Sequence, residues 1–145
     1  MLVNPKIISS AINIVMAQRL VRKLCPDCKK QIALEGKDKE IITNVISEIT
    51  DKTYLDGIDQ DHMWQAVGCD KCNNVGYKGR IGVYEGIIID ENIEKIVSDN
   101  PSEREVKKAS LSQNLLDIKQ DGILKILQGV TTLDELKRVV DIEKQ

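Results

Sequence analysis

The chain has 145 residues, of which 41% are hydrophobic and 30% are charged, a balance typical of a globular domain and not of a disordered segment. Its net charge of −2 excludes binding of nucleic acid or anionic lipid through bulk charge, and its apolar runs are too short to span a bilayer. The N-terminus MLVNPKIISS lacks the features of a signal peptide, so we expect a cytoplasmic protein.

The first part of the chain is expected to contain two helices and a short strand. Asn4-Pro5 predicts the start of an amphipathic helix over residues 5–18, followed by an apolar lead into a cysteine pair. Residues 31–34 (QIAL) predict a short strand. Asp38 is the expected N-cap of the second helix, whose apolar face consists of Ile42, Val45, Ile46 and Ile49.

The middle of the chain predicts a loop and two strands. Residues 50–61 are polar and rich in turn formers, so they are the expected loop. Residues 62–68 (HMWQAVG) predict a strand that enters a second cysteine pair. The strongest strand pattern lies at residues 80–89, where Ile81, Val83, Ile87 and Ile89 alternate along one side.

From Glu91 onward the pattern is helical. Asn100 is the expected N-cap of one helix, with Pro101 at its first position. A longer helix runs from about Leu116 to Leu127 and ends before Gly129, and residues 132–135 (TLDE) predict a capping box at the last helix. The expected fold class is therefore α+β, mainly helical with short strands.

Four cysteines carry the chemistry: Cys25, Cys28, Cys69 and Cys72. They form two Cys-x-x-Cys pairs, and two intervening residues allow a tight turn to direct both sulfurs at one point. In a reducing compartment such pairs favour metal ligands over disulfides. Gly68, Gly76 and Gly79 suit the sharp turns around the ion. We expect one structural metal ion, namely zinc, with no open coordination position for catalysis.

Several basic residues lie near the cysteines in the sequence. Four thiolates around a divalent ion carry a formal charge of −2, and Arg19, Arg22 and Lys71 are the side chains expected to offset it. A solvated basic face explains the lysines equally well. The single histidine, His62, is expected to be a surface or packed residue, and Trp64 a partly buried anchor.

Two other classes of protein remain open at this point. A stand-alone zinc-ribbon adaptor or nucleic-acid binder would use the local basic cluster, although no aromatic platform accompanies it. A rubredoxin-like electron carrier would hold iron in place of zinc. The sequence contains no phosphate-binding Gly-x-x-x-x-Gly-Lys-Ser/Thr loop and no hydrolase motif, so we expect no enzymatic activity from this chain alone.

Four blocks of sequence resemble the type II secretion and type IV pilus assembly ATPases. They are residues 17–28 (AQRLVRKLCPDC), 68–85 (GCDKCNNVGYKGRIGVYE), 120–125 (QDGILK) and 129–136 (GVTTLDEL). The blocks occur in the family's order and span nearly the whole chain. One departure is Gly86, where the family pattern leads us to expect an aliphatic residue.

The resemblance implies a place for this chain within a larger machine. It matches the C-terminal part of a RecA-like motor, where residues 1–24 end the RecA-like core (helix plus strand). Residues 25–90 form the tetracysteine zinc module with a helical insert, and residues 91–145 form a C-terminal helical subdomain. The parent is a hexameric ATPase that binds ATP through segments preceding this region.

The resemblance also implies partners and a location. The family works at the cytoplasmic face of the inner membrane, beside the platform protein that it drives. We therefore expect contacts with that platform protein and with neighbouring ATPase subunits, no nucleic acid, and membrane association only through partners. The zinc module would then stiffen the motor surface and help to dock the platform protein or a neighbouring subunit.

Overall fold

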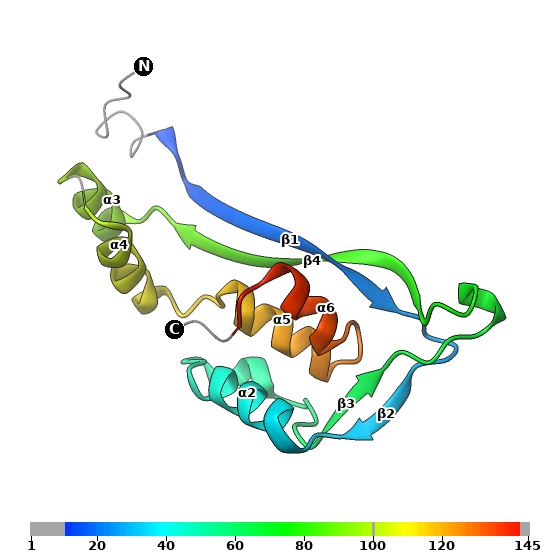
Figure 1. Cartoon of the computed structure of the whole chain (residues 1–145). Helices are drawn as coiled ribbons and strands as arrows, with labels where there is room; N and C mark the ends of the chain where they lie inside the picture. The colour runs from blue at the N-terminus through cyan, green and yellow to red at the C-terminus, as the bar shows by residue number, and fades with distance from the viewer. Residues whose placement is uncertain (1–10, 100, 143–145) are drawn as a thin grey trace. The chain divides into compact units, whose positions relative to one another are not determined.

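The computed structural model describes residues 11–99 and 101–142, which form an α+β fold as predicted (Figure 1). By contacts the chain divides into two units, Met1–Ala17 with Glu85–Leu115 (unit 1) and Gln18–Tyr84 with Leu116–Gln145 (unit 2). The chain passes between the units in strands β1 (Ile14–Leu24) and β4 (Tyr77–Ile88), which pair with each other. These units do not follow the three expected segments, whose assignment to domains stays a prediction.

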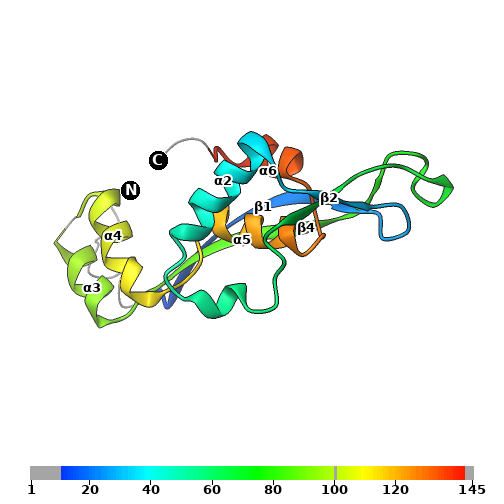
Figure 2. The ribbon, with the colours of Figure 1, turned by 90° about the horizontal axis from the view of Figure 1, so that it is seen from below.

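Unit 2 contains the main hydrophobic core. Helices α2 (Gly36–Ser47), α5 (Ile118–Leu127) and α6 (Leu133–Val139) supply most of it. Helix α5 contacts both α2 and α6 (Figure 2). Strands β2 (Lys30–Ala33) and β3 (His62–Gln65) form an antiparallel pair in which Lys30 faces Gln65. The predicted apolar face is confirmed for Ile42, Val45 and Ile46, which are buried on α2, and Ile49 is also buried but lies just beyond the end of the helix.

The predicted helix over residues 5–18 is wrong for its C-terminal part. Ile14 to Gln18 belong to the 11-residue strand β1, and residues 5–10 lie outside the described residues. Apolar residues at helical spacing in so short a segment also suit a strand, and the β-branched Ile14 and Val15 favour it. Pairing with β4, which has 12 residues, decides the conformation.

Two of the predicted helix caps differ, and a third is confirmed in part. Helix α2 begins at Gly36 after Glu35, and Asp38 lies in its first turn, where it pairs with Lys137. Helix α4 (Glu103–Ser110) is capped by Ser102 through a capping box with Glu105; Asn100 lies outside the described residues. At α6, the Thr132 side chain accepts from the Glu135 N–H and caps the helix as predicted. The capping box is incomplete, because the Glu135 carboxylate does not accept from the Thr132 N–H.

The predictions for the loop and for α5 are largely confirmed. Residues 50–61 are irregular except for one 3₁₀ turn, η1 (Lys52–Leu55). Helix α5 is capped by Asp117, and Gly129 follows its C-cap with a φ of 71°, as a C′ glycine requires. Two more 3₁₀ turns are η2 (Asp70–Cys72) and η3 (Leu111–Gln113).

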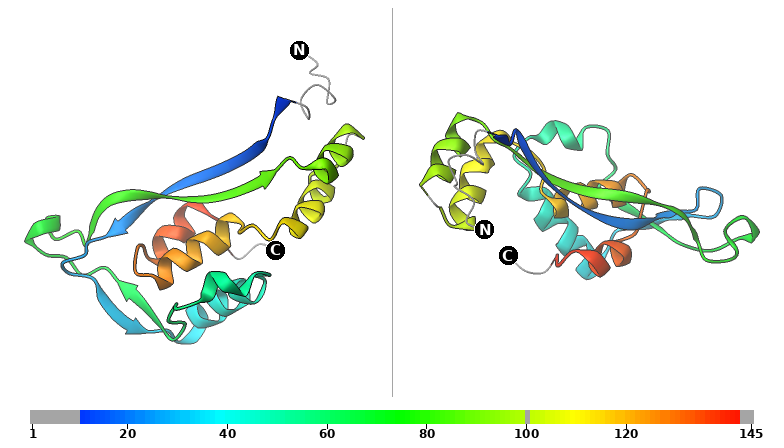
Figure 3. Two further views of the ribbon diagram at one scale, coloured as in Figure 1. Left: turned by 180° about the vertical axis from the view of Figure 1, so that it is seen from behind. Right: turned by 90° about the horizontal axis from the view of Figure 1, so that it is seen from above.

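Unit 1 has little core of its own. Helix α3 (Glu91–Ser98) packs against α4, as two views show (Figures 1 and 3). Among the described residues of unit 1, Ile93 is the one hydrophobic side chain that is fully buried. Over the part of the chain that the structure describes, no helix is both long and apolar enough to cross a membrane.

Candidate metal centre

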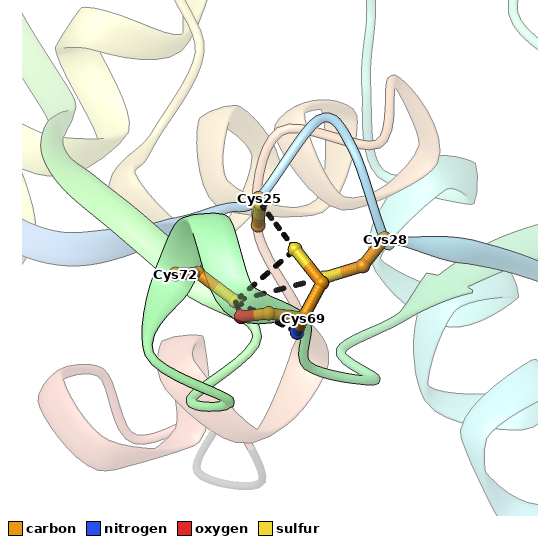
Figure 4. Close-up of side chains that lie close together, drawn as sticks. All are labelled: Cys25, Cys28, Cys69 and Cys72. Atoms are coloured by element: carbon orange, nitrogen blue, oxygen red, sulfur yellow. Dashed lines mark hydrogen bonds between the residues drawn. The ribbon is translucent and has the colours of Figure 1, made fainter.

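Two turns from distant parts of unit 2 bring the four cysteines together (Figure 4). The first turn follows β1 and carries Cys25 and Cys28, and the second includes η2 and carries Cys69 and Cys72. The Cys25 N–H donates to the Gly76 carbonyl at 2.9 Å, which joins the two turns through their backbones. The end of β1 is itself held by the Leu24 N–H, which donates to the Val130 carbonyl at 2.8 Å.

The spacing of the sulfurs suits a tetrahedral metal site. The Sγ atoms of Cys25 and Cys69 lie 3.9 Å apart, and those of Cys28 and Cys72 lie 3.8 Å apart. The Cys69 and Cys72 sulfurs are also 3.8 Å apart, and all four lie within 4.8 Å of one another. A tetrahedron of thiolates around zinc, with Zn–S near 2.3 Å, has an edge of about 3.8 Å. The four sulfurs therefore form a group able to hold one ion.

Backbone N–H groups point at the sulfurs. Cys72 Sγ accepts from the N–H groups of Cys69 and Gly76, both at 3.2 Å, and Cys28 Sγ accepts from Gly68 at 3.3 Å. Burial tends to raise the pKa of the Cys72 thiol, but hydrogen bonds from these two N–H groups and from the thiols of Cys28 and Cys69 together outweigh burial and lower the pKa to about 6. Burial raises the pKa of Cys28 to about 12. The backbone thus favours negative charge first at Cys72.

Two glycines allow the second turn to close. Gly68 has a φ of +115°, and a Cβ there would lie 2.7 Å from the Asn74 carbonyl oxygen. Gly76 has a φ of +82°, and its Cβ would lie 2.8 Å from the Cβ of Ala66. Both positions need glycine for conformation and for space. Gly79 also has a positive φ, as predicted, but open space around it.

Lys71 is the predicted charge-offsetting residue that lies at the site. Its ammonium pairs with the Asp27 carboxylate at 2.5 Å, and this bond, with a smaller contribution from Lys78, lowers the pKa of Asp27. The pKa of Lys71 is raised, mainly by Asp27 and further by the negative charge of Cys69 and Cys25. Arg19 is exposed and donates to the Gln18 carbonyl instead.

Arg22 has a different partner from the one expected. Its Nη2 lies 2.6 Å from Oε1 of Glu135, its Nε donates to the same oxygen, and its backbone N–H donates to Oε2. The Glu135 side chain is only 2% exposed. Burial tends to raise the pKa of Glu135, but the hydrogen bonds from Arg22 outweigh it, so the pKa is lowered.

Sequence analysis missed this contact because the capping-box pattern explained Glu135 locally. The two residues are 113 positions apart, so spacing gives no signal. Around them, the Thr131 hydroxyl donates to the Arg22 carbonyl, and the Tyr77 and Thr132 hydroxyls bond each other at 2.9 Å. Together these bonds hold the end of β1, and hence Cys25, against the α5–α6 turn.

The remaining predicted residues lie apart from the ligand set. His62 is exposed, and its Nδ1 lies 2.8 Å from Oδ2 of Asp59. Trp64 is half-buried, as predicted, beneath the Lys29 ammonium at 4.4 Å from the ring centroid. Lys29 also donates to the Gly129 carbonyl at 2.7 Å.

The fold and the site define a small α+β protein with a four-cysteine group that can hold a metal ion. A sequence model of the family described as "Type II/IV secretion system protein" matches residues 1–138, so the chain belongs to this family. This membership agrees with the resemblance seen in the sequence blocks.

Individual relatives carry names from two kinds of machine. The chain is 36% identical to the type IV pilus assembly ATPase TfpB of Acinetobacter baylyi, over 97% of this chain and 22% of that protein. It is 32% identical to the type II secretion system ATPase E of Vibrio cholerae, over 94% of this chain and 25% of that protein. It is 31% identical to the type IV pilus assembly ATPase PilB of Myxococcus xanthus, over 92% of this chain and 22% of that protein. The chain thus spans about a quarter of the length of these relatives.

Proposed function

We propose that this chain acts as the non-catalytic, zinc-bearing C-terminal region of a secretion or pilus-assembly ATPase. Its role would be structural and would include docking of partners during protein secretion or type IV pilus biogenesis. The observation that carries the proposal is the cluster of four cysteine sulfurs at tetrahedral spacing. Family membership supports the larger setting.

Zinc is the proposed ion, held by Cys25, Cys28, Cys69 and Cys72. Zinc commonly occupies closed sites with four thiolate ligands, and bound there it supplies a rigid cross-link and no chemistry. The protein's own groups do the rest: the N–H groups of Gly68, Cys69 and Gly76 stabilise the thiolates. Lys71 places a positive charge nearby, whereas Arg22 and Arg19 would offset the thiolate charge only from a distance.

Attachment to a RecA-like ATPase domain is supported by the first half of β1. Ile14, Val15 and Met16 are consecutive, so they alternate between the two faces of the strand, yet they are 52%, 52% and 61% exposed. A strand with apolar side chains on both faces is typical of a sheet that other layers of the protein cover on both sides. In the parent, layers of the RecA-like domain would cover it.

The partners proposed with this role are the inner-membrane platform protein and neighbouring subunits of a hexamer. The chain would lie in the cytoplasm, peripheral to the inner membrane, and reach the membrane only through these partners. The parent, and not this chain, would bind and hydrolyse ATP. Both kinds of machine appear among the relatives, so the proposal covers secretion and pilus assembly alike.

Metal analysis of the purified chain tests the identity of the ion. We expect one zinc per chain and a colourless protein, and loss of the zinc in Cys25→Ser. A red protein with one iron per chain would contradict the proposal in favour of a rubredoxin-like carrier. Sub-stoichiometric metal after growth in zinc-rich medium would also contradict it.

Complementation in the full-length ATPase tests the role. Cys69→Ser in the parent should lower secretion or piliation far more than nucleotide binding, and Lys108→Glu, on the exposed side of α4, serves as the control. Wild-type secretion or piliation in Cys69→Ser would argue against the structural role. The isolated chain should show no ATP turnover. ATP turnover by the pure chain that disappears when the chain is mutated would overturn the non-catalytic assignment.

A further inference from the structure

The turn between α5 and α6 binds both ends of the turn that carries the first two cysteines, here named the first cysteine turn. The Leu24 N–H, at the end of β1, donates to the Val130 carbonyl at 2.8 Å. The Lys29 ammonium, directly after Cys28, donates to the Gly129 carbonyl at 2.7 Å. Two neighbouring carbonyls of one short segment therefore hold the first cysteine turn from both sides.

The contact at the far end depends on a single side chain. The Lys29 ammonium also lies 4.4 Å from the centroid of the Trp64 ring, which adds a cation–π attraction. Trp64 packs directly on the α5–α6 turn, since a Cβ on Gly129 would lie 2.7 Å from the indole Nε1. Lys29 thus binds a backbone carbonyl and an aromatic ring that already touch each other.

The chain that leaves the second cysteine pair reaches the same α5–α6 turn. Gly76 accepts from the Cys25 N–H at 2.9 Å, and the hydroxyl of the next residue, Tyr77, bonds the Thr132 hydroxyl at 2.9 Å. Thr131 and Thr132 are buried, at 0% and 7% exposure. Both cysteine turns are therefore connected to one buried segment, so that segment helps to set how the two sulfur pairs lie relative to each other.

We propose that Lys29 is a positioning residue of the metal site: through Gly129 and Trp64 it holds Cys28 in the arrangement that binds the ion. The inference rests on the metal ion proposed above and gives the α5–α6 turn a part in binding it. Because such coupling is reciprocal, metal binding strengthens the Lys29 contacts by the same factor. The environment of Trp64 then responds to the metal, although Trp64 is no ligand.

A purely structural role for Lys29 predicts a different result. If Lys29 stabilised the chain equally with and without the metal, its removal would leave the metal affinity unchanged. If Lys29 positions Cys28, its removal lowers the population of chains whose sulfurs are correctly placed, and the apparent affinity falls with that population. Groups that orient ligands from outside the ligand set typically change metal affinity by about 10–100-fold.

The test is a zinc titration of the 145-residue chain in competition with a chromophoric chelator. Lys29→Met removes the ammonium and keeps the alkyl stem, and Lys30→Met is the matched control, since Lys30 is the next residue and is exposed. We expect Lys29→Met to bind zinc about tenfold more weakly, the low end of the range because Lys29 does not bond a ligand directly. Lys30→Met should bind within about twofold of the unmodified chain.

Fluorescence of Trp64, the one tryptophan of the chain, provides a second measure. Zinc loading of the unmodified chain should change the emission, because the metal fixes the ammonium over the ring. At saturating zinc, the same change in Lys29→Met should be smaller by at least about half.

The outcomes separate this inference from the proposed metal site. If the unmodified chain binds zinc and Lys29→Met binds it as tightly as Lys30→Met does, the positioning role is wrong while the metal site stands. Equal weakening in both lysine variants would indicate a general effect of charge and would also overturn the positioning role. If the unmodified chain binds no zinc, the metal site and the positioning role are both overturned.

Discussion

At the scale of single residues, the buried Glu135 is the residue whose environment matters most. Its carboxylate accepts three hydrogen bonds from Arg22 and one from Arg138. These bonds replace the water that the carboxylate loses on burial. The contact ties β1 to α6 only a few residues before Cys25, so it helps to position the cysteine group from outside it.

Removal of the Arg22 side chain should therefore destabilise the chain. We expect Arg22→Ala to lower the free energy of unfolding by about 1.5 kcal/mol, the low end for charged hydrogen bonds. The low end applies because the Arg22 side chain is 42% exposed. Urea unfolding of the zinc-loaded chain measures the change, and Arg19→Ala, an exposed arginine of the same strand, should cost less than 0.5 kcal/mol, roughly a surface effect. Equal costs for the two variants would contradict the positioning role.

The same carboxylate should give the chain a dependence on acid pH. The pKa of Glu135 is lowered in the folded state, so its contribution is present above the ordinary value of 4.5 and is lost as pH falls through the folded pKa. We expect the unmodified chain to lose stability faster than Glu135→Gln as pH falls below 4.5. Urea midpoints with excess zinc at each pH measure this difference, and parallel curves for the two proteins would contradict the assignment.

At the scale of elements, the metal turns depend on glycines that no other residue replaces. We expect Gly76→Ala to cost about 2–4 kcal/mol, because a positive φ and a close contact both oppose the added methyl group. Gly36→Ala is the matched control, since its φ is +59° but nothing lies within 4 Å of the new Cβ. That control should cost only about 1 kcal/mol.

Metal affinity provides a second measure of the same prediction. Gly76 also donates its N–H to Cys72 Sγ at 3.2 Å, so a shifted backbone weakens a ligand directly. A competition titration with a chromophoric chelator should show weaker zinc binding for Gly76→Ala and unchanged binding for Gly36→Ala. If both variants bind zinc like the unmodified chain, the turn is less constrained than its geometry indicates.

The element scale also shows where sequence patterns succeed and fail. The apolar face of α2 was predictable because Ile42, Val45 and Ile46 lie at helical spacing and all pack in the core of unit 2. The strand at residues 14–18 was not predictable, because a short apolar run fits both the helical and the strand periodicity until its partner strand is known. The start of α2 was also missed, since Glu35 makes no side-chain cap that a sequence pattern would reveal.

At the scale of the whole molecule, the four-cysteine group brings together segments that lie 44 residues apart in the chain, and an ion bound there would cross-link them. Removal of the ion should therefore loosen unit 2 as a whole. We expect a chelator to lower the free energy of unfolding by about 5 kcal/mol, which is less than the range for zinc-finger peptides because unit 2 has its own core. The melting temperature should fall by roughly 10–20 °C.

Calorimetry with and without chelator checks this expectation. Added zinc should restore the melting temperature, and added magnesium should not, since thiolates select soft or borderline metals. A melting temperature that does not change on metal removal would show that the core of unit 2 suffices without the cross-link.

The sequence by itself determined the family, the α+β class and the four cysteines that can hold an ion, because these depend on residue types at short spacing. Only the tertiary structure decided that residues 14–24 form a strand and that Arg22 pairs with Glu135. Both outcomes come from contacts between segments far apart in the chain. Local periodicity and short motifs carry no information about such contacts, since the energy that selects them comes from partners that only the folded chain brings together.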